Sequence, residues 1–181
     1  MLWVVRVLGV IFIALLIVLG LAVYKNAPQE YQILQWQDLI AKDAIQPEFL
    51  FSNMNLSAIS DADPMAEEML QAILAEWANA PVNDALNDSM VTISGYVVPL
   101  DWSDSRSLSE FLLVPYFGAC IHSPPPPANQ IIHIQLAQPV QNIHSMSEVS
   151  MSGRLIIQRN DAAAMGVSSY TMLLDEIERY Q

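Results

Sequence analysis

The hydrophobic pattern of this chain begins with one long apolar run. Val7 to Tyr24 is 18 residues without a charged or strongly polar side chain, and Arg6 and Lys25 bracket it. As a helix rising about 1.5 Å per residue it would be about 27 Å long, enough to cross a hydrocarbon core. The run is longer than the apolar region of a usual signal peptide, which has about 7–15 residues, and no small-x-small cleavage site follows it. We therefore expect residues 1–25 to be an uncleaved transmembrane anchor, with a cleaved signal as the alternative.

Helical spacing returns twice after the anchor. In a juxtamembrane segment, residues 26–60, the run Ile33–Ile40 predicts a short strand followed by a helical turn, with Trp36 and Leu39 docking on the core. From Asp61 to Ala80 apolar residues recur at helical intervals, with Asp63 and Pro64 suited to the N-cap and first-turn positions. This pattern predicts an amphipathic helix packed on a sheet.

The period then changes to two, which predicts strands. Five segments alternate or run apolar: Val91–Val98, Glu110–Tyr116, Ile131–Leu136, Val149–Ile157 and Ser168–Leu174. The first and fourth are alike, VTISGYVVP and VSMSGRLII, and each carries a central glycine, which is typical of a bulge or barrel corner. We expect a mainly β (α+β) domain over residues 61–181, a small five-stranded OB-like barrel with a leading helix; an open five-stranded sheet is the alternative.

Charge narrows the choice of partners and compartment. From Asn26 onward the chain holds five Lys and Arg against nineteen Asp and Glu. Binding to nucleic acid needs a basic stripe that neutralises phosphates, so we expect no nucleic-acid partner. A short stub before the apolar run and a large acidic part after it favour an inner-membrane protein, held through residues 7–24, whose domain lies in the periplasm.

Candidate chemistry gathers around a proline run. Cys120, the one cysteine of the chain, and His122 precede Pro124–Pro127, and His133 follows in the third predicted strand. Because Ile132 and Ile134 share one face of that strand, His133 takes the other. One Cys and two His form a known zinc site type, so these three residues are the candidate metal ligands, with zinc as the expected cofactor.

Two other readings of the same residues stay open. A histidine beside Cys120 would lower the pKa of the thiol and make it reactive, or all three residues would be structural. His144 lies in a polar loop and is left out of the ligand set. Asp101, Asp104 and Glu110 are expected to form a solvated face. No phosphate-binding loop or hydrolase motif occurs in the sequence, and an enzyme is the less favoured class.

Two stretches, ISGYVVPLD and EFLLVPYFGACIHSPPPPANQIIHI, resemble the bacterial family called domain of unknown function 3299. The resemblance extends over roughly Trp36 to Tyr180. It implies an exported, lipoprotein-like or membrane-anchored protein, often encoded beside ABC-type transporters and in some cases near zinc supply. Unlike the lipoprotein members, this chain has no N-terminal cysteine.

Together the patterns predict a membrane-anchored periplasmic accessory protein that binds zinc or another transition metal, and the family resemblance implies that it serves an ABC-type transporter. The alternative is a non-metal envelope adaptor that contacts an ABC permease through its proline loop and acidic surface. A thiol-dependent enzyme is the third hypothesis.

Overall fold

The computed structural model describes residues 9, 12–13, 15–17, 29–44, 64–100, 107–119, 125–161 and 166–180. The chain divides into two compact units, Met1–Glu30 and Tyr31–Gln181. In the first unit, Gly9 and residues 12–13 and 15–17 are helical. The rest of the expected anchor lies outside the described residues, and no helix among those described has the length and apolar character needed to span a membrane.

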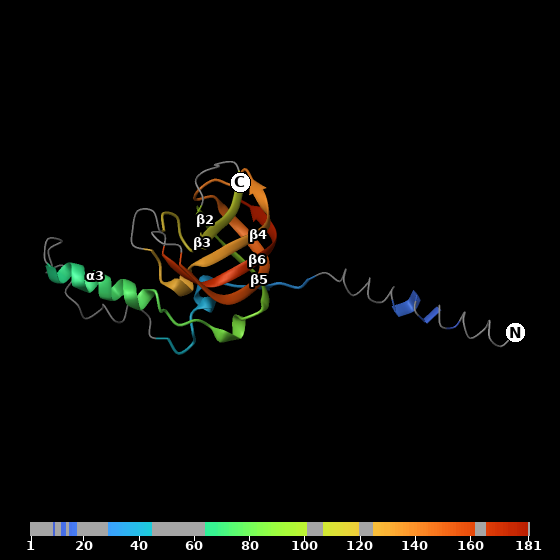
Figure 1. Ribbon diagram of the computed structural model, residues 1–181, viewed down its shortest axis with the longest axis horizontal. Coiled ribbons are helices and arrows are strands. Elements are labelled where there is room, and N and C mark those ends of the chain that lie inside the picture. The colour runs from blue at the N-terminus through green and yellow to red at the C-terminus, as the bar shows by residue number, and fades with distance from the viewer. Residues whose placement is uncertain are drawn as a thin grey trace. The chain divides into compact units, whose positions relative to one another are not determined.

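The second unit is mainly β, as predicted, with six strands and few helices (Figure 1). Its elements are β1 (Gln32–Ile33), η1 (Trp36–Leu39), α3 (Pro64–Trp77), η3 (Asp84–Leu86), β2 (Ser89–Pro99), β3 (Ser107–Val114), η4 (Ala128–Gln130), β4 (Ile132–Gln141), β5 (Glu148–Asp161) and β6 (Val167–Arg179). The short strand and helical turn expected before residue 41 are confirmed as β1 and η1. The strand Val167–Arg179 continues through the acidic residues that the sequence had placed after it.

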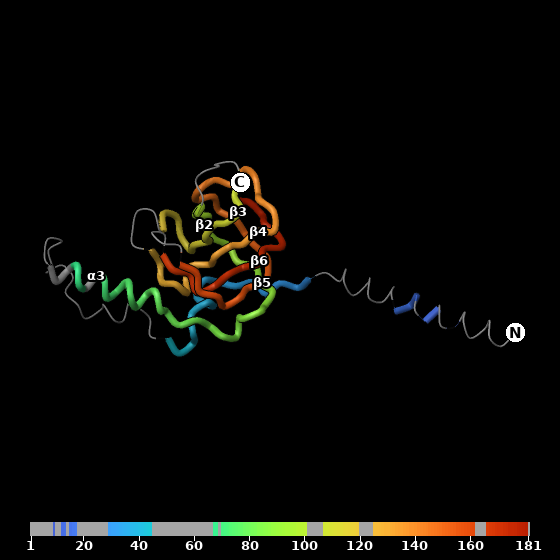
Figure 2. The backbone as a smooth tube through the Cα atoms, viewed as in Figure 1, coloured from blue at the N-terminus to red at the C-terminus, as the bar shows by residue number. Residues whose placement is uncertain are grey.

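Strand pairing runs in the order β1-β2-β3-β4-β6-β5, and β5 also pairs with β2. The pairings among β2, β3, β4, β6 and β5 therefore form a closed ring. Figure 2 shows the course of the backbone through these strands. The β4–β6 and β1–β2 pairs are parallel and the others antiparallel. The expectation of a five-stranded barrel needs correction: β1 adds a sixth strand outside the ring, and β2 contacts β3 only along Tyr96–Pro99, so this is not a clean barrel.

The two central glycines have distinct roles in this curvature. A Cβ on Gly153 would lie 2.3 Å from the Leu173 carbonyl oxygen, and the β5–β6 register shifts at this residue, so the predicted bulge is confirmed. A Cβ on Gly95 would lie 2.7 Å from the Val114 carbonyl oxygen. Next to Gly95, Tyr96 pairs with both β5 and β3. The β2–β5 pairing ends at this residue and the β2–β3 pairing begins there. Glycine therefore permits the close strand approach at both corners.

The interior of the ring holds the main hydrophobic core. Fully burying an aliphatic or aromatic side chain stabilises the fold by about 1.5–3 kcal/mol. The largest buried side chains in this core include Leu39, Ile93, Phe111, Ile134, Leu155, Tyr170 and Met172. Leu39 is fully buried and Trp36 packs at the edge, which confirms that η1 docks on the core.

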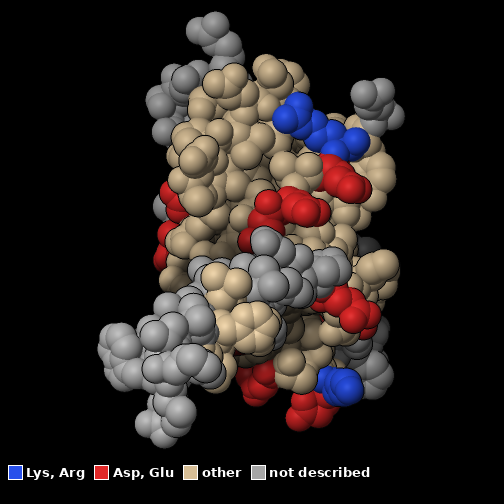
Figure 3. All heavy atoms as spheres, turned by 90° about the vertical axis from the view of Figure 1, so that its right-hand side faces the viewer, with Lys and Arg blue, Asp and Glu red and all other residues tan. Residues whose placement is uncertain are grey.

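Helix α3 begins at Pro64 and ends before Pro81, as its sequence predicts, but it projects from the strands (Figure 1). Leu70 remains 37% exposed, and Ile73 and Leu74 are only half-buried. The exposed Leu70 therefore departs from the expectation that the apolar stripe packs on the sheet, whereas Ile73 and Leu74 follow it only in part. Figure 3 shows acidic side chains in several places on one face of the molecule and few basic ones.

Candidate functional site

The three predicted metal ligands fall into two groups. Cys120 and His122 lie outside the described residues, so the structure does not test them. His133 lies on β4, and its side chain points away from the main core formed by Ile132 and Ile134, as the alternation predicts. It is nevertheless buried, with 4% of its surface exposed.

The imidazole of His133 is held on one side only. Its Nε2 lies 2.5 Å from Oε1 of Glu110, which requires a proton between the two atoms. Its Nδ1 is buried and has no hydrogen-bond partner among the described residues. In the neutral ring this arrangement makes Nε2 the donor and leaves the lone pair of Nδ1 unused.

Strand alternation brings Glu110 to the histidine. Glu110 and Leu112 are two residues apart on β3 and share its outer face, and Leu112 is the cross-strand partner of His133. The β3–β4 register shifts between Leu108 and Glu110, so Leu108, unlike Glu110, packs in the main core. Glu110 was expected to form a solvated face; its carboxylate is half-exposed and also binds His133, while Asp101 and Asp104 lie outside the described residues.

The neighbouring strands continue this polar row. Thr171 on β6 is the register partner of His133 and is 1% exposed. Its Oγ1 accepts a hydrogen bond from Nδ2 of Asn160 at 2.7 Å. Beside the row lies a second apolar cluster on the outer face, to which Leu112, Ala119 and Ile131 belong. Ala119, the last described residue before Cys120, therefore lies in the same apolar cluster as Leu112, the cross-strand partner of His133.

The remaining acidic and histidine side chains offer no second site in the described part of the chain. No group of three or more His, Cys, Asp or Glu gathers closely enough there to hold a metal ion. His144 is exposed, and its backbone N–H donates to Oγ of Ser147.

The proline run is packed against the ring. Pro126 is buried, and a Cβ on Gly166 would lie 2.8 Å from Cβ of Pro125. Gly166 has φ +102°, a conformation that favours glycine, so this residue lets the end of the β5–β6 connection approach the prolines. The described prolines, residues 125–127, are thereby held against the ring directly before η4.

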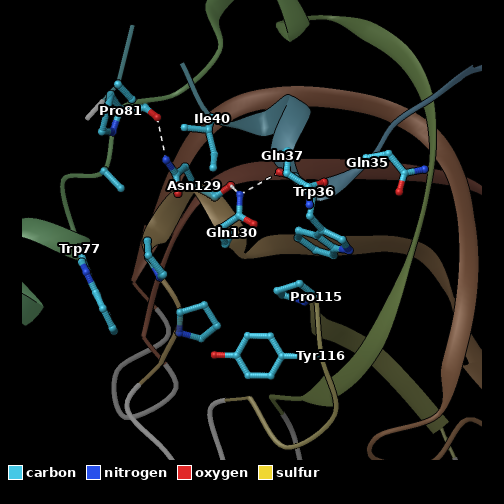
Figure 4. A pocket seen from close by; sticks show the side chains of 14 residues that line it. Gln35, Trp36, Gln37, Ile40, Trp77, Pro81, Pro115, Tyr116, Asn129 and Gln130 are labelled. Atoms are coloured by element: carbon cyan, nitrogen blue, oxygen red, sulfur yellow. Dashed lines mark hydrogen bonds between the residues drawn. The ribbon is translucent and has the colours of Figure 1, made fainter. Parts of the chain in front are cut away.

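A cavity of about 570 Å³ lies beside the prolines, and we call it the Trp36 cavity (Figure 4). Its described lining consists of aromatic, proline, carboxamide and small aliphatic residues: Gln35, Trp36, Gln37, Ile40, Ala44, Trp77, Ala80, Pro81, Pro115, Tyr116, Pro126, Pro127, Asn129 and Gln130. Its volume falls within the usual range for small-molecule sites. None of these lining residues is charged.

Side-chain hydrogen bonds to the backbone hold the walls of the Trp36 cavity. Asn129 Nδ2 donates to the Pro81 carbonyl at 2.8 Å, and Gln130 Nε2 donates to the Trp36 carbonyl at 2.9 Å (Figure 4). Trp36 in turn donates its indole N–H to the Ser94 carbonyl at 2.8 Å. These bonds connect the N-terminal segment, the α3–η3 connection and η4 to one another and to β2.

Tyr170 fastens the same segments from inside the ring. Its hydroxyl donates to the Leu39 carbonyl at 2.7 Å and accepts from the Asn83 N–H at 2.8 Å. Burial raises the pKa of Tyr170 to about 12, helped by the charge of Asp84 and opposed by the Asn83 N–H. The neutral phenol is thus the form that the fold requires.

The sequence did not predict the Trp36 cavity. Its walls come from four segments far apart in the chain, and only the sheet pairing brings them together. Trp36 itself was expected to dock on the core, which is correct, but the same indole also faces the cavity.

Comparison with known proteins agrees with this architecture. The family model described as "Protein of unknown function (DUF3299)" matches residues 36–179. The crystal structure of a DUF3299 family protein from Pseudomonas aeruginosa PAO1 is similar, with 30% sequence identity and a TM-score of 0.61, over 84% of this chain and 98% of that one. No curated protein matches the chain. The chain therefore belongs to the DUF3299 family.

Proposed function

We propose that this protein is a membrane-anchored periplasmic accessory protein that binds a transition metal, zinc above all, through Cys120, His122 and His133. The observation that carries the proposal is the buried Nδ1 of His133, which has no partner in the part of the chain that the structure describes, while Nε2 is held by Glu110. A buried polar atom without a partner is costly, and a bound ligand would remove that cost.

The pairing with Glu110 is the arrangement expected around a metal-binding histidine. Such a histidine usually donates its second ring N–H to a carboxylate, which fixes the tautomer and makes the free nitrogen a better ligand. Thiolate and imidazole ligands together favour zinc among the common metals. The placement of Ala119 in the apolar cluster beside His133 supports Cys120 and His122 as the other two ligands.

The scaffold we propose for this site is an OB-like barrel on a membrane anchor. Strand pairings that pass through β2, β3, β4, β6 and β5 and return to β2 support the barrel. The apolar run 7–24 supports the anchor, and the acidic remainder of the chain supports a periplasmic domain. The proposal that an ABC-type transporter is the partner rests on the family resemblance.

Metal analysis of the purified full chain tests the proposal. We expect close to one zinc per chain in the wild type and a loss in each of the variants Cys120→Ser, His122→Ala and His133→Ala. His144→Ala is the matched control, because this histidine is exposed, and it should keep its metal. Affinity should fall from neutral pH to about pH 5, since ligand histidines must be neutral and a free imidazole has a pKa of about 6.5. Metal-free wild type, or equal zinc in all five proteins, would refute the site.

A second candidate function is favoured by helix α3. Its apolar residues Leu70, Ile73 and Leu74 are exposed or half-buried on a helix that projects from the strands. Such a face suits an adaptor that contacts an envelope protein. A photo-crosslinker at Leu70, compared with one at the exposed Gln71, would support the adaptor if it captured a transporter subunit from Leu70 alone. Equal capture from both positions would count against it.

A further inference from the structure

We propose that the Trp36 cavity binds a neutral saccharide. This inference does not depend on the metal site: of the expected ligands, His133 does not line the cavity, and Cys120 and His122 lie outside the described residues. It goes beyond the proposed function by naming a second site and the chemical class of its ligand.

The first argument is charge. The chain has a net charge of −12, yet every described residue that lines the cavity is uncharged. Among the described lining residues an anionic ligand would find no cation and a cationic ligand would find no carboxylate, and the acidic protein would repel an anion. Burial of an unpaired charge is unfavourable, so the lining selects an uncharged ligand.

The second argument is the shape of the walls. In Figure 4 the rings of Trp36 and Tyr116 lie on one side of the cavity and that of Trp77 on the opposite side. Flat aromatic faces offer large apolar contact areas at low conformational cost, with polar atoms only at the ring edge. The C–H faces of a pyranose ring match such surfaces, while its hydroxyl groups project toward the rim.

The third argument is the supply of hydrogen bonds. Gln130 Nε2 donates to two backbone carbonyls, those of Trp36 and Asn129. Asn129 Nδ2 and the Trp36 indole N–H are also bonded to backbone carbonyls. The carboxamide oxygens of Asn129 and Gln130 accept from no described residue, so the fixed groups of the cavity are largely acceptors.

A ligand for this site must therefore donate hydrogen bonds. Saccharide hydroxyls donate to carboxamide oxygens and also accept from amide N–H groups, so they can pair with either end of a carboxamide. A proline-rich peptide is the competing occupant of an aromatic- and proline-lined groove, but it offers mainly carbonyl acceptors. Because the Trp36 indole and the Gln130 amide already donate to the protein's own backbone, a ligand that donates as well as accepts fits better.

Calorimetric titration of the full chain tests this proposal. The protein is kept in a detergent without a sugar headgroup, because a maltoside would compete for the site. The ligands are maltotriose, cellotriose and chitotriose, a sulfated trisaccharide as the anionic counterpart, and a ten-residue polyproline peptide. The variants are Tyr116→Ala and, as a matched control, Phe117→Ala; Phe117 is 70% exposed, packs edge-on against Tyr96 and does not line the cavity.

We expect saturable binding of at least one neutral trisaccharide and weaker binding of the sulfated one. Tyr116→Ala should weaken the neutral ligand about tenfold, the size expected for one aromatic contact, and Phe117→Ala should change its affinity less than about twofold. Adding zinc or removing it with a chelator should not alter the result. Binding of polyproline in preference to every saccharide, equal effects of the two variants, or no saccharide binding would each overturn the proposal.

Discussion

The outer face at His133 and the Trp36 cavity satisfy their polar groups in opposite ways. At His133 a buried ring nitrogen has no partner, while the other nitrogen is fixed by Glu110. In the cavity, Trp36, Asn129 and Gln130 direct their N–H groups to backbone carbonyls. The first region is arranged to form a direct bond with a ligand atom; the second is arranged to hold rigid walls around a ligand.

Of the substitutions that test this comparison, His133→Ala should produce the largest change in ligand affinity. It removes a direct ligand, so zinc affinity should fall by more than the roughly 10–100-fold loss that supporting residues cause. Saccharide binding should stay within about twofold of wild type, because His133 does not line the cavity. Competition titration against a zinc chelator measures the first quantity and calorimetry the second. Loss of both activities together would indicate general unfolding and would erase the proposed distinction.

Glu110→Gln should weaken zinc by about 10–100-fold, since it removes the carboxylate charge while keeping the length of the side chain. Glu110 is half-exposed, so the variant should fold. The same chelator competition measures the loss. Gln135→Glu is a control at the exposed cross-strand neighbour of Glu110, and it should leave affinity almost unchanged. An affinity for zinc in Glu110→Gln equal to wild type would show that the carboxylate does not orient the ring.

Tyr170→Phe should lower the free energy of unfolding by about 1–3 kcal/mol, because the Leu39 carbonyl loses the shorter of its two hydrogen bonds and the Asn83 N–H loses one of its two acceptors. The lost hydrogen bonds lie in the segments around the cavity, so the number of zinc ions bound per chain should not change. Urea unfolding, followed by far-UV circular dichroism, measures it. A variant as stable as wild type would mean that the hydroxyl contributes nothing to holding η1 and η3.

Tyr170 also predicts a pH dependence. Its pKa in the folded state, about 12, lies above the ordinary value of 10 for an exposed phenol, so its contribution to stability is complete below pH 10 and is lost between pH 10 and 12. The wild type should therefore lose its stability advantage over Tyr170→Phe across that interval. Urea midpoints of the two proteins from pH 8 to 11.5 test this; a constant difference would contradict it.

Arg154→Gln should have the smallest effect. Asp88 and Arg154 form an ion pair at 3.0 Å, but both side chains are more than half exposed. Such pairs contribute about 0–1 kcal/mol and are screened by salt. The urea midpoint should shift little, and less at high salt. A loss as large as that of Tyr170→Phe would show that the buried and exposed contacts do not differ as described.

The periodic parts of this fold could be read from the sequence, and the contacts between distant segments could not. Alternation located β2, β4 and β5, and it placed His133 away from Ile132 and Ile134. The bond between Glu110 and His133 joins two strands, and only the β3–β4 register shows that His133 lies opposite Leu112, two residues after Glu110. The amphipathic stripe of α3 was visible, but a stripe does not say what covers it.

The Trp36 cavity shows the same limit of sequence reasoning. Trp36, Trp77, Tyr116 and Gln130 belong to four separate segments, and no spacing in the chain connects them. Asn129 and Gln130 follow the proline run and look like ordinary loop residues in the sequence. Only the fold shows that their amides bind the backbone of Pro81 and Trp36.

Cobalt titration of the full chain, followed by absorption spectroscopy, tests the central claim most directly, because Co²⁺ takes the place of zinc and reports the atoms that bind it. The account predicts tetrahedral ligand-field bands together with a thiolate charge-transfer band in the wild type. It predicts that Cys120→Ser loses the charge-transfer band and that His133→Ala needs a much higher cobalt concentration to show either. A wild-type spectrum without a thiolate band, or one that His133→Ala leaves unchanged, would contradict a metal site built on this cysteine and this histidine.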